Sequence, residues 1–505
     1  MAYAQKMKAK LFDIEAGKYI SVIHECDAKQ LAVFPLDRVE IFNPRTKKRI
    51  VTVADLTDSV VKENEIGLFE DVRKIIGAKE KDILSVSAVP QPESVKLIKK
   101  KMDKQALTEK EIMEIVKDLS DNKLSEIEAS AFVSAIYING FSLEETISMT
   151  KALVKDGERL NIEKEPVVDK HSIGGVNGRT TMILVPIIAS QGLYIPKTSS
   201  RSITSSAGTA DAMEILSNVC LSLEQIKKIT EKIGGVIAWG GAIDLAPADD
   251  KIIKIEHPLS LDPNGQVIAS VMGKKASVGA RYVVIDIPVG PNTKVKTKEK
   301  AEAMARKFIE VGKSLGMKVE VVLTDGSKPC GKAFGPALEA KLVMEILEGK
   351  LYDELAEKAC DLSGILLELA GKERKGMGAI KAKEILKNGK ALKKMQEIIK
   401  AQGGKIFSSD QIKLSPLKKK ILSEKEGEIE NINVKILNEV ARIAGAPADK
   451  KAGVMLKAED GQKIRLNDVL YEIYAENRRK LELAAKYAQK NNAIELQEII
   501  IEEIK

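Results

Sequence analysis

Aromatic side chains, histidines and cysteines are scarce in this chain of 505 residues. Phe, Trp and Tyr make up 4% of it, and it has three histidines and four cysteines. So few aromatic rings argue against a platform on which nucleic-acid bases stack. The cysteines lie far apart, without metal-binding spacing or a disulfide framework, and this predicts reduced and mostly buried thiols. We therefore expect an activity that needs neither a metal nor a cofactor.

Long hydrophobic runs are also missing. Residues 182–189 form an apolar stretch that is too short to cross a membrane, and we interpret it as a buried helix. The first residues are not followed by an apolar core and a cleavage site, so we expect no secretory signal and a cytoplasmic location. The formal net charge is +8, with many charges of both signs. This balance favours anionic ligands slightly but is not typical of nucleic-acid binding, so neither a membrane nor a nucleic acid is an expected partner.

The order of predicted elements favours an α/β protein with four domains. Residues 1–88 hold short β-rich runs at 31–35, 39–42 and 49–53, which indicate a small barrel-like β domain. Three capping-box pairs, Thr108 with Glu111, Ser125 with Glu128 and Ser142 with Glu145, predict a helical domain over 92–160. We assign a later segment, about 250–280, to that domain too. Alternating strands and helices over 165–420 predict a large α/β domain with a mostly parallel central sheet, and 421–505 predict a C-terminal α+β region.

Two clusters of glycine and hydroxyl residues follow consecutive predicted strands of the α/β domain. Residues 169–175 have the sequence DKHSIGG, and residues 199–211 have the sequence SSRSITSSAGTAD. Parallel strands present their carboxyl ends at one edge of a sheet, where ligands bind. Cations, hydroxyls and backbone N–H groups without a screening Cβ suit phosphate oxygens. The P-loop pattern is absent, which argues against ATP hydrolysis. We predict a phosphate pocket that both clusters share.

Residue chemistry suggests how this pocket works. Lys170 supplies a point charge, Arg201 supplies a two-pronged fork for phosphate, and hydroxyl donors come from Ser172, Ser199, Ser200 and Thr209. His171 lies inside the glycine loop and is a candidate ligand contact, whereas His24 is expected to be structural. For Asp211 and Glu214, in the first turn of the next predicted helix, we favour capping and loop support.

Taken in order, these motifs resemble the thymidine and pyrimidine-nucleoside phosphorylase family from about residue 92 onward. Residues 268–275 resemble that family's base-binding helix, and residues 331–339 resemble another of its signatures. Two features depart from the nucleoside enzymes. These are the extra N-terminal domain and a serine-rich second cluster where those enzymes typically carry Gly-Arg-Gly and His-Thr-Gly-Gly-Thr. Both departures resemble the archaeal AMP phosphorylase branch of the family.

The resemblance implies that AMP and phosphate give adenine and ribose 1,5-bisphosphate in nucleotide salvage, with CMP and UMP as further substrates. It implies Asp262 as the proton donor to purine N7, although the sequence Asp262-Pro263-Asn264-Gly265 is also a strong turn signal. The implied phosphate ligands are Lys170, Ser172, Ser199 and Thr209. The implied nucleotide contacts are Gly174, Ser200, Arg201, Ser202, Ile203, Thr204, Ser205, Thr209, Ser270, Lys274 and Lys294.

Three alternatives stay open at this point. A nucleoside phosphorylase acting on thymidine or uridine would use the same chemistry. An anthranilate-type phosphoribosyltransferase would need magnesium-bound diphosphate, for which Asp249 and Asp250 could serve. A non-enzymatic sensor or scaffold would use the N-terminal β domain for interaction. Because an added β domain with exposed edges invites pairing, we expect residues 1–88 to govern homo-oligomerisation as a dimer or larger assembly.

Overall fold

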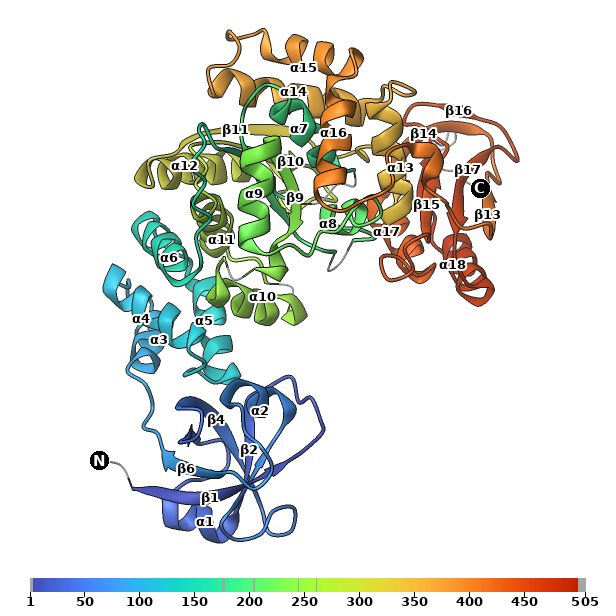
Figure 1. Ribbon diagram of the computed structural model, residues 1–505. Coiled ribbons are helices and arrows are strands. Elements are labelled where there is room, and N and C mark those ends of the chain that lie inside the picture. The colour runs from blue at the N-terminus through green and yellow to red at the C-terminus, as the bar shows by residue number, and fades with distance from the viewer. Residues whose placement is uncertain (1–2, 175–177, 203–204, 244, 260, 498–505) are drawn as a thin grey trace, which may run out of the picture. The chain divides into compact units, whose positions relative to one another are not determined.

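A computed structural model describes residues 3–174, 178–202, 205–243, 245–259 and 261–497 (Figure 1). Its internal contacts divide the chain into two units. The first consists of Met1–Asp156 and Pro247–Ala269, and the second of Gly157–Ala246 and Ser270–Lys505. The boundary near residue 270 falls within one helix, so that helix contributes to both units.

The first unit begins with a closed six-stranded barrel, in the order β1-β5-β2-β4-β3-β6. Side chains alternate between buried and less buried along β3, as a strand with one face on a core requires. The barrel confirms the predicted N-terminal β fold, but its closure pairs the strand edges that were expected to be exposed and to drive oligomerisation. Its elements are β1 (Ala4–Leu11), β2 (Ile20–His24), α1 (Glu25–Leu31), β3 (Arg38–Asn43), β4 (Lys48–Thr57), β5 (Glu65–Leu68), α2 (Glu70–Ile76) and β6 (Ile83–Ala88).

One predicted strand in this domain is wrong. Residues 31–35 are not extended, because Leu31 ends α1 and Ala32 takes the left-handed conformation of a helix C-cap, with φ 53°. Leu31 and Val33 still pack into the barrel core, whereas Phe34 is 72% exposed. The helix that precedes it therefore outweighs the β propensity of a short apolar run.

Helices complete the first unit. All three predicted capping boxes are present: the side chains of Thr108, Ser125 and Ser142 accept from the third helical residue, and its glutamate accepts from the cap backbone. Their apolar faces share one core around Phe132 and Met149. The helices are α3 (Ser94–Met102), α4 (Glu109–Ser120), α5 (Glu126–Asn139), α6 (Leu143–Asp156), α10 (Pro247–Leu259) and the start of α11 (Asn264–Ser277).

The second unit is built on a parallel sheet. Strands β11-β10-β7 pair in parallel, β8 pairs with β9, and a parallel bridge between Val167 and Tyr194 joins the two sets. The apolar run at 182–189 lies in a fully buried helix, α7, as predicted. The elements are β7 (Val168–Ser172), α7 (Thr180–Ala189), β8 (Ile195–Ser199), α8 (Thr209–Met213), α9 (Leu223–Ile233), β9 (Gly235–Trp239), η1 (Gly240–Ala242), β10 (Tyr282–Val289), α12 (Lys298–Ser314), β11 (Lys318–Asp325), α13 (Pro336–Leu347), α14 (Glu354–Leu369), α15 (Gly378–Lys387), α16 (Lys390–Ala401) and η2 (Ser409–Gln411).

The C-terminal region packs onto this α/β part through a shared sheet, in the order β12-β15-β17-β13. Gly335 shows how close the two parts lie, since a Cβ built on it would be 2.4 Å from the Ala452 carbonyl oxygen. The architecture confirms the predicted fold class. In the part of the chain that the structure describes, no helix is long and apolar enough to span a membrane. The remaining elements are β12 (Ala333–Phe334), β13 (Lys418–Leu422), β14 (Gly427–Ile432), α17 (Val434–Ile443), β15 (Gly453–Leu456), β16 (Lys463–Ile464), β17 (Val469–Tyr474), α18 (Arg478–Lys490) and β18 (Ile494–Leu496).

Candidate active site

The two predicted clusters begin at neighbouring strand ends of the parallel sheet. Ser172 is the last residue of β7, and Ser199 is the last residue of β8. The bridge between Val167 and Tyr194 makes these strands neighbours with the same direction. Their carboxyl ends therefore lie on the same edge, which is where open parallel sheets bind ligands.

Lys170 is the buried cation of the first cluster. Its ammonium group donates a hydrogen bond to the Ser172 hydroxyl, and Ser172 donates to Asp286 Oδ2 at 2.6 Å. Lys170 Nζ lies 4.0 Å from the same carboxylate oxygen. Burial lowers the pKa of Lys170 to about 8; Asp286 opposes this shift and Lys358 adds to it. Burial therefore destabilises the charged form of Lys170, and an anion bound beside it would stabilise that form again.

Asp286, on β10, connects three elements around Lys170. Its carboxylate accepts from Thr324 Oγ1 at 2.6 Å and lies 3.1 Å from Lys358 Nζ, which also donates to Thr324 Oγ1 at 3.0 Å. Burial would raise the pKa of Asp286, but Lys170, Lys358 and the two hydroxyl donors outweigh it and lower that pKa. Asp286 therefore stays ionised and anchors both lysines.

A second buried carboxylate, Asp169, holds two further lysines. Lys275 Nζ lies 2.7 Å from Asp169 Oδ2, and Lys197 Nζ lies 3.3 Å from Oδ1. Burial would raise the pKa of Asp169, but the two lysines lower it overall. Burial also lowers the pKa of Lys197 to about 7, against the pull of Asp169.

The two networks together leave unbalanced positive charge. Four lysines face two aspartates, so two formal positive charges remain when all six side chains are ionised. Gathering like charges in a buried place is costly unless an anion neutralises them. This arrangement suits a phosphate dianion. Among the four lysines, only Lys170 was predicted from the sequence as a phosphate ligand.

His171 follows Lys170 on β7 and is only partly exposed. Burial, and then the positive charges of Lys275, Lys197, Lys170 and Lys274, lower its pKa well below 6.5. The imidazole is therefore neutral at physiological pH. It can exchange a hydrogen bond with a ligand but does not carry a positive charge there.

Arg201 in the second cluster is held by carboxylates. Its guanidinium nitrogens lie 2.5 and 2.8 Å from the two Glu214 oxygens and 3.1 Å from Asp211 Oδ1, and the group stacks 4.7 Å from the Trp239 ring. Hydrogen bonding to Glu214 raises its pKa. Asp211 also accepts from the backbone N–H groups of Ser202 at 2.7 Å and Gly208 at 2.9 Å, which confirms the expected loop support. A contact between Arg201 and a ligand phosphate stays a prediction.

Of the second cluster, residues 200–202 and 205–208 lie close together between β8 and α8. Gly208 is needed there because a Cβ would lie 2.5 Å from the Ser200 carbonyl oxygen. Ser202 and Ser205 hydroxyls lie 3.1 Å apart, and Thr209 is the first residue of α8. Ile203 and Thr204 lie outside the described residues.

A contact from the C-terminal region fixes this loop. Asn438 Oδ1, on α17, accepts from the Ser206 backbone N–H at 3.0 Å and from the Ser206 hydroxyl at 2.9 Å. Asn438 Nδ2 donates to the Val434 carbonyl at 3.0 Å, so the orientation of its amide is set by its own helix. Nothing in the local sequence around residue 438 indicates this contact.

Ser270 and Lys274, which the resemblance places at the base, lie on α11, and Lys294, a further predicted nucleotide contact, lies in the loop after β10. Lys274 Nζ is 3.4 Å from Ser270 Oγ, one helical turn away. Lys294 lies beside Gly174, since a Cβ built on Gly174 would be 3.6 Å from Lys294 Cε. Asp262 belongs to the first unit, where it is exposed between α10 and α11.

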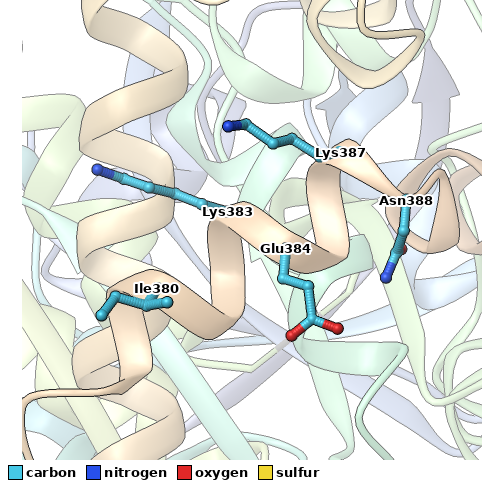
Figure 2. Close-up of a pocket in the computed structure, with 5 residues that line it drawn as sticks. All are labelled: Ile380, Lys383, Glu384, Lys387 and Asn388. Carbon is cyan, nitrogen blue, oxygen red and sulfur yellow. The ribbon is translucent and has the colours of Figure 1, made fainter.

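A separate surface depression lies along α15 (Figure 2). Its lining residues are Ile380, Lys383, Glu384, Lys387 and Asn388, all from this helix and its C-cap. None of them belongs to the lysine and aspartate networks. It is an open groove on one helix face, and we assign it no part in the chemistry.

The fold and this site define a glycosyl transferase. Residues 95–157 match the helical bundle domain of the glycosyl transferase family, and residues 164–392 match its a/b domain. Residues 428–495 match the pyrimidine nucleoside phosphorylase C-terminal domain.

More closely, the chain is 45% identical to an AMP phosphorylase of Pyrococcus furiosus, over 98% of this chain and 99% of the relative. It is 43% identical to an AMP phosphorylase of Thermococcus sibiricus, over 99% of both chains. The chain belongs to the AMP phosphorylase family, which confirms the resemblance seen in the motifs.

A solved anthranilate phosphoribosyltransferase from Thermus thermophilus shares the fold. It covers 61% of this chain and 99% of its own length, with a TM-score of 0.53 and 19% identity. At this identity the likeness concerns the fold alone.

Proposed function

We propose that this protein is a pentosyltransferase that cleaves nucleoside 5′-monophosphates with phosphate. AMP and phosphate give adenine and ribose 1,5-bisphosphate, and CMP and UMP react in the same way. A phosphate oxygen forms a bond to the anomeric carbon, the bond from that carbon to the base nitrogen breaks, and the base takes up a proton. The observation that carries this proposal is the pair of buried networks, next to the two glycine and hydroxyl clusters, in which four lysines face only two aspartates.

The attacking phosphate is held, in this proposal, by Lys170, Ser172, Ser199 and Thr209. Ser172 and Ser199 end adjacent strands, and Lys170 already contacts Ser172. Donors fixed by a sheet need little rearrangement when the reaction begins, and such preorganisation lowers the barrier. The developing positive charge on the ribose ring is then stabilised by the dianion beneath it.

The leaving base requires a proton and positioning. We assign the proton to Asp262, and contacts with the base to Ser270 and Lys274, whose polar groups lie together on α11. We assign the rest of the nucleotide to Gly174, Lys294, Arg201 and the loop at 200–205, with His171 as a neutral hydrogen-bonding partner. The neighbouring positions of Gly174 and Lys294 support placing them in one subsite.

The remaining proposals concern the chain as a whole. We assign residues 1–88 to homo-oligomerisation, 92–160 with about 250–280 to the helical domain, 165–420 to phosphate and nucleotide binding, and 421–505 to the C-terminal α+β domain. We propose that the enzyme acts in the cytoplasm. Deleting residues 1–88 should reduce the assembly size measured by light scattering; an unchanged size would contradict the assignment.

Phosphate-dependent release of free base tests the proposed reaction. AMP, CMP and UMP should each lose their base only when phosphate is present, and adenosine and uridine should react much more slowly. Asp262→Asn, which keeps the size of the side chain but cannot supply a proton, should lower kcat by roughly 10²- to 10⁴-fold, the usual contribution of general acid catalysis. Faster turnover of nucleosides would favour a nucleoside phosphorylase, and loss of activity with a chelator would favour a magnesium-dependent transferase.

A further inference from the structure

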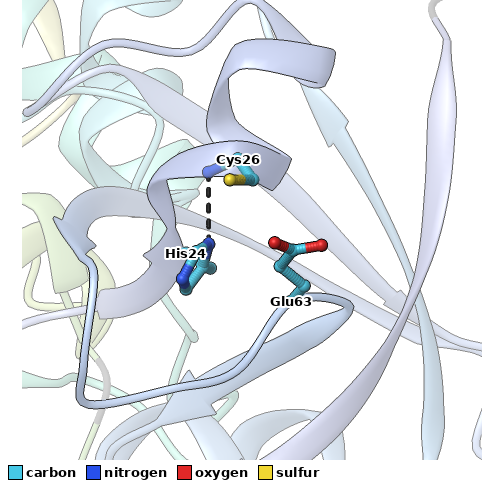
Figure 3. Close-up of side chains that lie close together, drawn as sticks. All are labelled: His24, Cys26 and Glu63. Atoms are coloured by element: carbon cyan, nitrogen blue, oxygen red, sulfur yellow. Dashed lines mark hydrogen bonds between the residues drawn. The ribbon is translucent and has the colours of Figure 1, made fainter.

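The N-terminal barrel brings together three side chains that the proposed reaction does not use. His24, Cys26 and Glu63 each offer one ligand atom, and these atoms all lie within 4.8 Å of one another. Figure 3 shows the imidazole, the thiol and the carboxylate grouped around the start of α1. They represent three different donor chemistries: nitrogen, sulfur and oxygen.

Barrel topology explains why residues so far apart in the sequence meet. His24 ends β2 and pairs in register with Thr57, at the end of the parallel strand β4. Strand β5 runs antiparallel to β2, with Ile23 opposite Ile66. The connection from β4 to β5, which carries Glu63, therefore passes the end of β2, and Cys26 follows in the first turn of α1.

We propose that His24, Cys26 and Glu63 bind one thiophilic divalent cation of the Zn²⁺ class. Imidazole, thiolate and carboxylate are the three protein ligands that Zn²⁺ accepts, and sites with three of them complete a tetrahedron with water. Mg²⁺ and Ca²⁺ prefer oxygen ligands alone, so a set that contains sulfur and nitrogen selects against both. On binding, the Cys26 thiol releases its proton to solvent and the sulfur donates an electron pair to the cation.

The metal competes with an existing contact. His24 Nδ1 accepts a hydrogen bond from the Cys26 backbone N–H at 3.2 Å and thereby caps α1. Coordination through Nδ1 uses that same lone pair, and coordination through Nε2 requires a proton on Nδ1. Either mode breaks the hydrogen bond that caps α1, so we expect the metal ion to be released readily.

Asp27, the residue after Cys26 on α1, does not supply a fourth protein ligand. Asp27 is buried and accepts hydrogen bonds from Gln5 Nε2 at 2.6 Å and from the Asn64 backbone N–H at 2.7 Å. Those bonds fix the loop that carries Glu63 to α1. The same contact therefore preorganises the three ligands and leaves the fourth position to water.

Titration of the full-length protein with Co²⁺ tests this proposal, because a thiolate bound to Co²⁺ gives a charge-transfer absorption band in the near ultraviolet. We expect the band to saturate at one Co²⁺ per chain and to disappear when Zn²⁺ is added. Cys26→Ser should abolish it. Glu63→Gln and His24→Asn should each weaken Co²⁺ binding by more than about tenfold, because losing even a residue that only hydrogen-bonds to a metal ligand typically costs that much affinity.

Two controls keep the test specific. Asn is among the favoured N-cap residues, so His24→Asn removes the imidazole while α1 keeps its cap. Cys220 is the other exposed cysteine, and Cys220→Ser should leave the band unchanged. A wild-type protein without a band, a band that survives in Cys26→Ser, or a band that disappears in Cys220→Ser would each overturn the proposal. None of these outcomes bears on phosphorolysis, which uses other residues.

Discussion

Replacing Lys358 by methionine tests whether the buried network around Asp286 controls the phosphate site. Lys358 enters from α14, and its Nζ lies 3.1 Å from Asp286 Oδ2 and 3.0 Å from Thr324 Oγ1. The side chain of Lys358 is 14% exposed and that of Asp286 is 1% exposed. Methionine keeps an apolar stem of similar length but removes the charge, the ion pair with Asp286 and the hydrogen bond to Thr324.

The expected loss of stability follows from what Asp286 retains. Removing one partner of a buried ion pair costs about 3–5 kcal/mol. Asp286 keeps the hydroxyls of Ser172 and Thr324, each at 2.6 Å, and Lys170 at 4.0 Å. We therefore expect the free energy of unfolding to fall by about 3 kcal/mol, at the lower end of that range.

Two kinetic effects should accompany this loss. Without Lys358, the Asp286 carboxylate draws Lys170 away from the phosphate position, and kcat/KM for phosphate should fall by about 10- to 100-fold. Lys358 is also one of the charges that lower the pKa of Lys170. Its removal should raise that pKa above about 8, so the alkaline limb of the pH profile should move to higher pH.

Urea unfolding and the pH dependence of kcat/KM for phosphate measure these effects. Lys358→Arg should recover part of the activity because it restores the charge. Lys383→Met is a matched control, since Lys383 pairs with Glu357 in a much more exposed position and such pairs contribute only about 0–1 kcal/mol. If Lys358→Met unfolds like the wild type and its alkaline limb does not move, the network does not govern Lys170.

Three further outcomes are expected. Because Lys170 has a pKa of about 8, it is charged below that pH and neutral above it, so kcat/KM for phosphate should decline as the pH rises past about 8; a flat profile would contradict this. Gly208→Ala would place a Cβ 2.5 Å from a backbone oxygen and should abolish phosphate binding measured by calorimetry, whereas Gly240→Ala, with its nearest contact at 3.7 Å, should bind normally. Asn438→Leu leaves two donors of the buried Ser206 without their acceptor, so thermal unfolding should show a loss of about 1–3 kcal/mol, and KM for phosphate should rise.

Local signals predicted much of the fold. Capping boxes gave the starts of α4, α5 and α6 because a cap is decided by residues three positions apart. The buried strand β10 follows from a continuous apolar run, whereas β11, whose apolar residues suggest the same burial, has no buried residue. The run at 31–35 failed because a helix end and an apolar strand look alike over five residues.

The site residues likewise divide into those that local sequence predicts and those whose role depends on distant contacts. Lys170 and Ser172 were predictable because they lie in a glycine cluster next to a strand. Lys358 lies inside a helix and Lys275 near the end of another, and neither position differs in sequence from a solvent-exposed lysine. Their role depends on which carboxylate the fold places opposite them, Asp286 or Asp169, and that pairing spans more than 70 residues in each case.

The hydrogen bonds of Ser172 show why two lysines flank Asp286. A hydroxyl has one proton, and Ser172 gives it to Asp286 while it accepts from Lys170. To donate to a phosphate dianion, Ser172 must turn away from the carboxylate, and Asp286 then loses a hydrogen bond in a buried place. Lys170 stands 4.0 Å from that carboxylate and Lys358 stands 3.1 Å from it, so the remaining charge stays compensated when the hydroxyl leaves. The arrangement that holds Ser172 before binding thus also allows its hydroxyl to turn toward the phosphate. With a single lysine, the network could not compensate the charges of Asp286 and the phosphate at the same time.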